Sequence, residues 1–228
     1  MNNRIPEDAE SVEEGLSNKV FFHEDRVYKV YRFFPLPGLY ASLIELLRGR
    51  IVFYSRHRRI RNEVKMTGLI EKAGIRTPEI LEVVDNMIVF QKISGKSGFR
   101  YLSECGEDEA SQFGERIRDF LDELHSLDVA LKDVRLSNFI VSNGEVFSID
   151  HEFASLEAGK LFKILDELTV LSSARQTPNY HDFAEGFNPH RYAVYLSVFT
   201  AFYHILIFNR SRERLKNLLA SLRPRKQS

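Results

Sequence analysis

Four polar residues between positions 133 and 150 have the types and the spacing needed for chemistry on a phosphate group. Asp133 can accept or orient the proton of an attacking hydroxyl, and Arg135 can offset negative charge on a transferred phosphoryl group. Asn138 and Asp150 supply oxygen ligands of the kind that Mg²⁺ prefers, one from each side of a short predicted hairpin. Together these residues form a set that is typical of phosphoryl transfer.

Two charged residues further upstream complete this set. Lys29 lies in the middle of the predicted strand 26–32, where a charged residue on a partly buried face needs a partner or a phosphate. Glu63, on a predicted long helix, is the natural partner. We interpret the two residues as a pair that holds the phosphates of a nucleotide.

The first half of the chain is predicted to consist of two strand pairs with helices between them. Runs of β-branched and aromatic residues predict the strands, and the two-residue sequence Asp85-Asn86 predicts a tight turn within the second pair. Gly74 is the expected stop of the longer helix. The first fourteen residues are acidic and form either a loose lead-in or a poorly ordered strand. The predicted strands are 19–23, 26–32, 79–84 and 87–91, and the predicted helices are 39–47 and 56–73.

The second half is predicted to be mainly helical. It contains one small hairpin at 139–149, with a Ser-Asn-Gly turn, and a short basic helix at the end of the chain. The run 192–208 is too short and too polar for a membrane span, so we expect a buried helix and not an integral membrane protein. The predicted longer helices are 108–127, 159–175 and 191–208.

Composition excludes several classes of protein. A chain of 228 residues with 43% hydrophobic residues, 12 Gly and 7 Pro is neither disordered nor collagen-like. The 32 Lys and Arg residues balance 32 Asp and Glu residues, which removes a general attraction of the whole surface to nucleic acid. The single cysteine, Cys105, and the absence of an apolar leader lead us to expect a cytoplasmic protein.

The order of these residues resembles that of the protein-kinase-like superfamily. Residues 133–138, Asp-Val-Arg-Leu-Ser-Asn, match its D-x-K-x-x-N catalytic loop, and residues 150–152, Asp-His-Glu, stand where D-F-G normally stands. Within the superfamily the chain is most similar to the small atypical kinase of the KEOPS tRNA-modification complex, which is related to the RIO kinases. The supporting features are Asn62-Glu63, Ala73 to Pro78, Ile93 to Gly95, His125 eight residues before Asp133, and the basic tail 223–226.

The resemblance implies an α+β, two-lobed fold. Residues 1–93 would form a β-rich N-lobe with one long helix, and residues 94–228 a helical C-lobe that carries the catalytic loop 131–138. ATP with Mg²⁺, or with Mn²⁺, would lie in the cleft, its adenine against the backbone near Gln91 to Ile93. The implied site residues are Asp133 and Arg135 for catalysis, Lys29, Glu63, Gly15, Gln91 and Ile93 for ATP, and Asn138 and Asp150 for the metal.

The chain departs from the superfamily pattern at three places. Leu131-Lys132 replaces the usual His-Gly or His-Arg before the catalytic aspartate, and the Gly-rich loop is reduced to Gly15. His151 and Glu152 replace the phenylalanine and glycine of D-F-G, and both residue types are able to add metal ligands.

The resulting expectation is an ATP- and Mg²⁺-dependent phosphotransferase that acts on Ser/Thr hydroxyls or uses ATP turnover to serve a partner complex. One alternative is a kinase of a sugar, lipopolysaccharide or other small molecule near a membrane, favoured by Phe33-Phe34 and the apolar stretches 39–47 and 192–208. Another is a pseudokinase scaffold. The basic segment Arg48 to Arg61 and the C-terminal tail are candidate contacts for tRNA or a protein partner, or solvated surface.

Overall fold

The protein is described by a computed structural model in which residues 5–6, 8–14, 18–32, 55–156 and 159–187 are placed. Several predictions lie outside these described residues. They are Gly15, Phe33-Phe34, the helices at 39–47 and 191–208, Arg48, Arg50 and the basic C-terminal tail.

A five-stranded antiparallel sheet is built from the first half of the chain, in the order β1-β2-β3-β5-β4. Both predicted hairpins are confirmed, and their turns place Glu24 and Asp85 in the left-handed region, with φ of 50° and 38°. Within the acidic first fourteen residues, predicted as a loose lead-in or a poorly ordered strand, residues 10–14 form strand β1, which pairs with β2. The bounds are β1 Glu10–Glu14, β2 Asn18–His23, β3 Arg26–Tyr31, β4 Ile80–Val84 and β5 Met87–Gln91.

Helix α2, Arg56–Lys72, confirms the predicted long helix. Ser55 caps its first turn by accepting a hydrogen bond from the backbone of Arg58, and Gly74 follows its end with φ of +84°. Near its start Ile60 packs with Tyr31 and with residues of β5, and its later turns enter the main core of the helical region. Helix α2 therefore joins the sheet to the rest of the molecule.

The second half of the chain is mainly helical, as predicted, with short strands that the sequence did not reveal. The predicted helices at 108–127 and 159–175 and the hairpin at 139–149 are confirmed. The elements not predicted are β6, α3, β7, η1, β10 and α6, each of two to seven residues, because tertiary contacts, and not periodicity, determine them. The bounds are β6 Lys96–Ser97, α3 Gly98–Glu104, α4 Glu107–Ser126, β7 Val129–Ala130, η1 Leu136–Asn138, β8 Phe139–Ser142, β9 Glu145–Ser148, β10 Ser155–Leu156, α5 Lys160–Ala174 and α6 Tyr180–Glu185.

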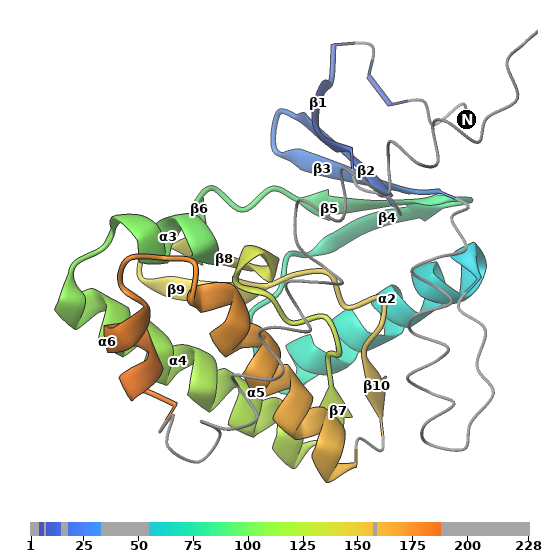
Figure 1. Ribbon diagram of the computed structural model, residues 1–228. Helices are drawn as coiled ribbons and strands as arrows, with labels where there is room; N and C mark the ends of the chain where they lie inside the picture. Colours follow the sequence, from blue (N-terminus) through green and yellow to red (C-terminus); the bar gives the residue numbers. More distant parts are fainter. Residues whose placement is uncertain (1–4, 7, 15–17, 33–54, 157–158, 188–228) are drawn as a thin grey trace, which may run out of the picture.

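The fold is α+β, which confirms the predicted class. Figure 1 shows the five-stranded sheet at the top, helices α3 to α6 below it, and α2 alongside. The largest core cluster lies in the helical region and includes Met66 and Ile70 of α2 with Ile117, Leu121 and Leu124 of α4. Within the described residues no helix has both the length and the apolar character needed to cross a membrane.

Candidate functional site

Lys29 stands at the centre of a group of buried charges. It lies on β3 and is 7% exposed. Its Nζ is 2.6 Å from Oε2 of Glu63, on α2, and 2.7 Å from Oδ1 of Asp150, in the segment that follows β9. The predicted contact between Lys29 and Glu63 is confirmed, and the structure adds Asp150 to it, while the role of the pair toward phosphates stays a prediction.

The charges in this group stabilise one another. Burial alone would lower the pKa of Lys29, but the carboxylates of Asp150 and Glu63 outweigh burial and hold that pKa well above its usual value. Burial would raise the pKa of Asp150, but Lys29, with a smaller contribution from Arg135, holds it below its usual value. Burial raises the pKa of Glu63, which also accepts a hydrogen bond from the Tyr31 hydroxyl. Lys29 and Asp150 are therefore an ion pair at neutral pH.

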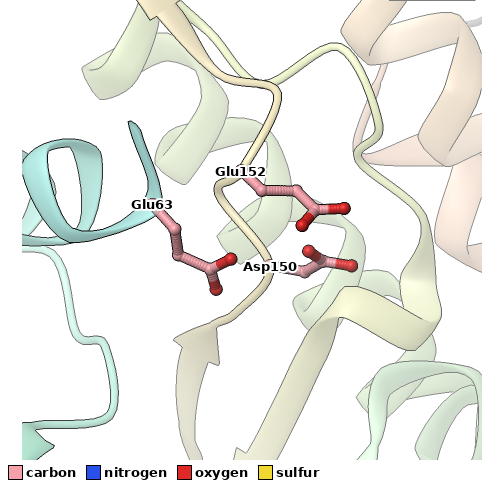
Figure 2. Close-up of side chains that lie close together, drawn as sticks. All are labelled: Glu63, Asp150 and Glu152. Carbon is pink, nitrogen blue, oxygen red and sulfur yellow. The ribbon is translucent and has the colours of Figure 1, made fainter. Parts of the chain in front are cut away.

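A third carboxylate, Glu152, lies beside the other two. Figure 2 shows Glu63 projecting from α2 toward Asp150 and Glu152, which come from the segment after β9. Oxygen atoms of the three carboxylates lie within 4.8 Å of one another. Nη2 of Arg59 donates to both oxygens of Glu152, at 2.9 and 2.8 Å. Burial raises the pKa of Glu152 to about 7, against the opposing charges of Lys29 and Arg59.

His151 is buried between α2 and the end of β9. Its Nδ1 lies 2.9 Å from the hydroxyl of Thr67, and its Nε2 lies 2.9 Å from the hydroxyl of Ser148. Burial lowers the pKa of the imidazole to about 4, so the ring is neutral at neutral pH. Because both nitrogens are engaged by hydroxyl groups, His151 ties the segment to α2, and the expectation that it adds a metal ligand is wrong.

The loop that contains Asp133 is held by short-range contacts. Nη2 of Arg135 lies 2.7 Å from Oδ2 of Asp133, and the side-chain amide of Asn138 donates to the carbonyl of Asp133 at 2.7 Å. The carbonyl of Asn138 accepts from the backbone of Ile149 at 2.9 Å. This last contact brings Asn138 next to Asp150, as the predicted hairpin required.

Asp166, on α5, anchors the same loop and was not predicted. Its two carboxylate oxygens accept hydrogen bonds from the backbone N–H groups of Leu131 and Lys132, both at 2.8 Å. One of them also lies 3.3 Å from Nε2 of His125. Lys132 has φ of +67°, a conformation that costs about 1 to 3 kcal/mol and so needs such support. The available signal was an acidic residue on the apolar side of an amphipathic helix.

The remaining predicted residues have mixed outcomes. Gln91 is the last residue of β5, and Ile93 lies two residues later, in the segment that leads to β6, so the role of this backbone toward adenine stays a prediction. The basic segment Arg48 to Arg61 is predicted to contact tRNA or a partner, or to be solvated, and for Arg59 both alternatives are wrong, because its side chain is 2% exposed and is bound to Glu152. Arg58 and Arg61, by contrast, are exposed on α2.

The donor set of the site suits a hard cation. Asp150 uses one oxygen to bind Lys29, and Asn138 uses its amide N–H to bind the Asp133 carbonyl, so these two bonds occupy neither the second oxygen of Asp150 nor the amide oxygen of Asn138. Carboxylate and amide oxygens are the ligands that Mg²⁺ prefers. Asp150 and Asn138 therefore fit the metal role that was predicted for them.

Comparison with known proteins finds two weak relatives and no matching family model. Both relatives carry the name "Probable bifunctional tRNA threonylcarbamoyladenosine biosynthesis protein". The relative from Methanospirillum hungatei is 30% identical over 96 residues, which are 42% of this chain and 17% of that protein. The relative from Methanosarcina barkeri is 23% identical over 171 residues, 75% of this chain and 27% of that protein. The chain thus spans less than a third of the length of these curated relatives.

Proposed function

We propose that this protein is an ATP- and Mg²⁺-dependent phosphotransferase with a two-lobed, protein-kinase-like fold. The observation that carries the proposal is the position of Lys29, joined at 2.6 Å to Glu63 and at 2.7 Å to Asp150. A strand lysine paired with a helix glutamate and next to a metal-binding aspartate is the arrangement that phosphoryl transfer requires in kinases. In this proposal the sheet and α2 form the N-lobe, and the region after residue 93 forms the C-lobe.

Each residue of the site has a role in this proposal. The charge of Lys29 neutralises phosphate oxygens, and Glu63 fixes the lysine side chain from α2. The Asp133 carboxylate orients the acceptor hydroxyl and takes up its proton, and Arg135 offsets charge on the transferred group. Asn138 and Asp150 would hold the metal ion. ATP and Mg²⁺ supply the phosphoryl group and further charge neutralisation when bound.

The comparisons favour a place in tRNA modification. Both relatives are named for tRNA threonylcarbamoyladenosine biosynthesis, and we propose that this chain serves the same process within a protein complex. The exposed side chains of Arg58 and Arg61 are candidate contacts for tRNA, together with the basic tail. The test compares tRNA binding by the wild type, by the double variant Arg58→Ala/Arg61→Ala and by Lys160→Ala, which removes an exposed cation from α5. Loss of binding in the double variant alone would support this role, and equal binding by all three proteins would remove it.

The central test measures Mg²⁺-dependent ATP binding and ATP turnover in the full chain. We expect binding in the wild type, and turnover or autophosphorylation that is lost in Asp133→Asn and Asp150→Asn. Asp122→Asn, an exposed aspartate on α4, is the matched control and should keep both. ATP binding with no turnover would identify a pseudokinase, and no ATP binding in a folded protein would overturn the proposal.

A further inference from the structure

Three side chains of α2 hold the segment after Asp150 through hydrogen bonds. Arg59 binds both carboxylate oxygens of Glu152, and the amide of Asn62 donates to the carbonyls of Glu152 and Ala154 at 2.9 and 2.8 Å. One turn further along the helix, Thr67 binds His151 at 2.9 Å. The segment 151–154 is thus held on α2 by polar contacts along one face of the helix.

Arg59 is the centre of this arrangement. The same Nη2 that binds Glu152 also donates to Oδ1 of Asn18, the first residue of β2, at 2.7 Å. The guanidinium lies 5.3 Å from the ring centre of Tyr31 and 5.7 Å from that of Phe153. Arg59 is buried and is held by Asn18 of the sheet and by Glu152 of the segment, so its side chain has little freedom to move.

The charge of Glu152 matters for Lys29. Oε2 of Glu152 is 3.9 Å from Nζ of Lys29, whereas it is 2.8 Å from Nη2 of Arg59. The group contains three carboxylates and two cations, so without Arg59 the nearest cation for Glu152 is Lys29. Glu152 would then compete with any phosphate for the lysine.

We propose that Arg59 and Glu152 are a positioning pair for the nucleotide site, in which Arg59 holds the segment 151–154 on α2 and keeps the Glu152 carboxylate off Lys29. This inference rests on the proposed function, because Lys29 is taken as the residue that meets the phosphates. Both residues act through Lys29 and Asp150, and neither touches the reacting atoms. The pair allows a glutamate at position 152 without adding net negative charge beside the phosphates.

The test compares Arg59→Met, Glu152→Gln and the double variant in the full chain. The dissociation constant for Mg²⁺-ATP is measured by calorimetry. We expect Arg59→Met to weaken binding by about tenfold or more, Glu152→Gln to change it by about twofold or less, and the double variant to recover most of the loss. Lys65→Met, which removes an exposed cation from the same helix, is the matched control.

The expected difference between Arg59→Met and Glu152→Gln in the dissociation constant for Mg²⁺-ATP separates a positioning role from a merely structural one. If Glu152→Gln weakens binding as much as Arg59→Met and the double variant is no better, the pair only stabilises the fold and the proposal is overturned. If Arg59→Met does not fold, the double variant decides, because recovered ATP binding supports the proposal and its loss contradicts it.

A second measurement keeps the inference separate from the proposed function. Amide hydrogen exchange of residues 150–156 is compared between Arg59→Met, or the double variant, and Lys65→Met, without nucleotide. Faster exchange of this segment in the variant that lacks Arg59 than in Lys65→Met supports the proposal that Arg59 positions the segment. Equal exchange in the two variants overturns that proposal. Should the wild type bind no ATP, the proposed function fails, and this measurement still decides whether the pair positions the segment.

Discussion

The two halves of the candidate site are built in different ways. Lys29, Glu63 and Asp150 come from β3, from α2 and from the segment after β9, and the two residues of the Lys29–Asp150 contact are 121 positions apart in the chain. Asp133 and Arg135, in contrast, are two positions apart and joined to each other. The first half exists only when the whole fold is assembled, whereas the second is largely a local loop that α5 anchors through Asp166 and Ser173.

Lys29 and Glu63 of the first half are also more deeply buried than the second half. Their side chains are 9% and 2% exposed, whereas those of Asp133 and Arg135 are 25% and 31% exposed, and Asp150, at 27%, resembles the second half. A buried charge that loses its partner destabilises the fold, whereas water can solvate a half-exposed one. We therefore expect substitutions in the first half to reduce stability and those in the second to reduce the reaction rate. The following predictions test this comparison, in order of decreasing effect.

Asp133→Asn should have the largest effect, and only on the rate. The amide cannot take up a proton, so turnover should fall by about a hundredfold to ten-thousandfold. The melting temperature should stay within about 1 °C of the wild type, because the replaced carboxylate is partly solvated. Steady-state kinetics and thermal melting check both parts. A rate equal to that of the Asp122→Asn control would show that Asp133 is not the proton acceptor.

Lys29→Met should reduce stability most. It leaves the buried Glu63 and the partly exposed Asp150 without their shared cation, and the free energy of unfolding should fall by about 3 kcal/mol in denaturant titrations. Adding Glu63→Gln should return part of the loss, since one uncompensated carboxylate is then removed. A loss of stability no greater than that of an exposed substitution would break the distinction between the two halves.

Asp166→Asn should have a smaller effect, which lowers both the stability and the turnover rate. One of two charge-assisted hydrogen bonds to the backbone of residues 131 and 132 is lost, and unfolding should require about 2 kcal/mol less. Turnover should also fall, because the loop that carries Asp133 is less fixed. Denaturation and kinetics on the same preparation measure the two effects. Unchanged stability would mean that Asp166 does not anchor the loop.

Arg100→Ala should have the smallest effect. Arg100 pairs with Glu104 one turn further along α3, but its side chain is 69% exposed, and such pairs contribute little. We expect no measurable change in melting temperature or in ATP turnover. A clear destabilisation would contradict the view that only the buried charges of this protein matter for stability.

Much of the fold was predictable because local rules governed it. The hairpin of β2 and β3, the helix α2 and the hairpin of β8 and β9 all have periodicity and turn residues that operate over a few positions. The Lys29–Glu63 pair was also predictable, since a cation in an apolar strand requires an anion nearby. Arg59 was misassigned for the complementary reason. Within the segment 48–61 Arg59 is one of seven basic residues, a pattern typical of a solvated or ligand-binding surface, and nothing local distinguishes it.

The sequence by itself determined the longer helices, the hairpins and the chemical types of the site residues, because strand and helix periodicity, turn residues and the spacing of Asp133, Asn138 and Asp150 are local properties of the chain. Only the tertiary structure decided which charges are buried and which partners they have. It joined Arg59 to Glu152 across 93 positions and placed Asp166 under the loop of Asp133. Such contacts depend on how separate elements pack, and the cost of burying a charge, which is set by those partners, is therefore a property of the whole fold.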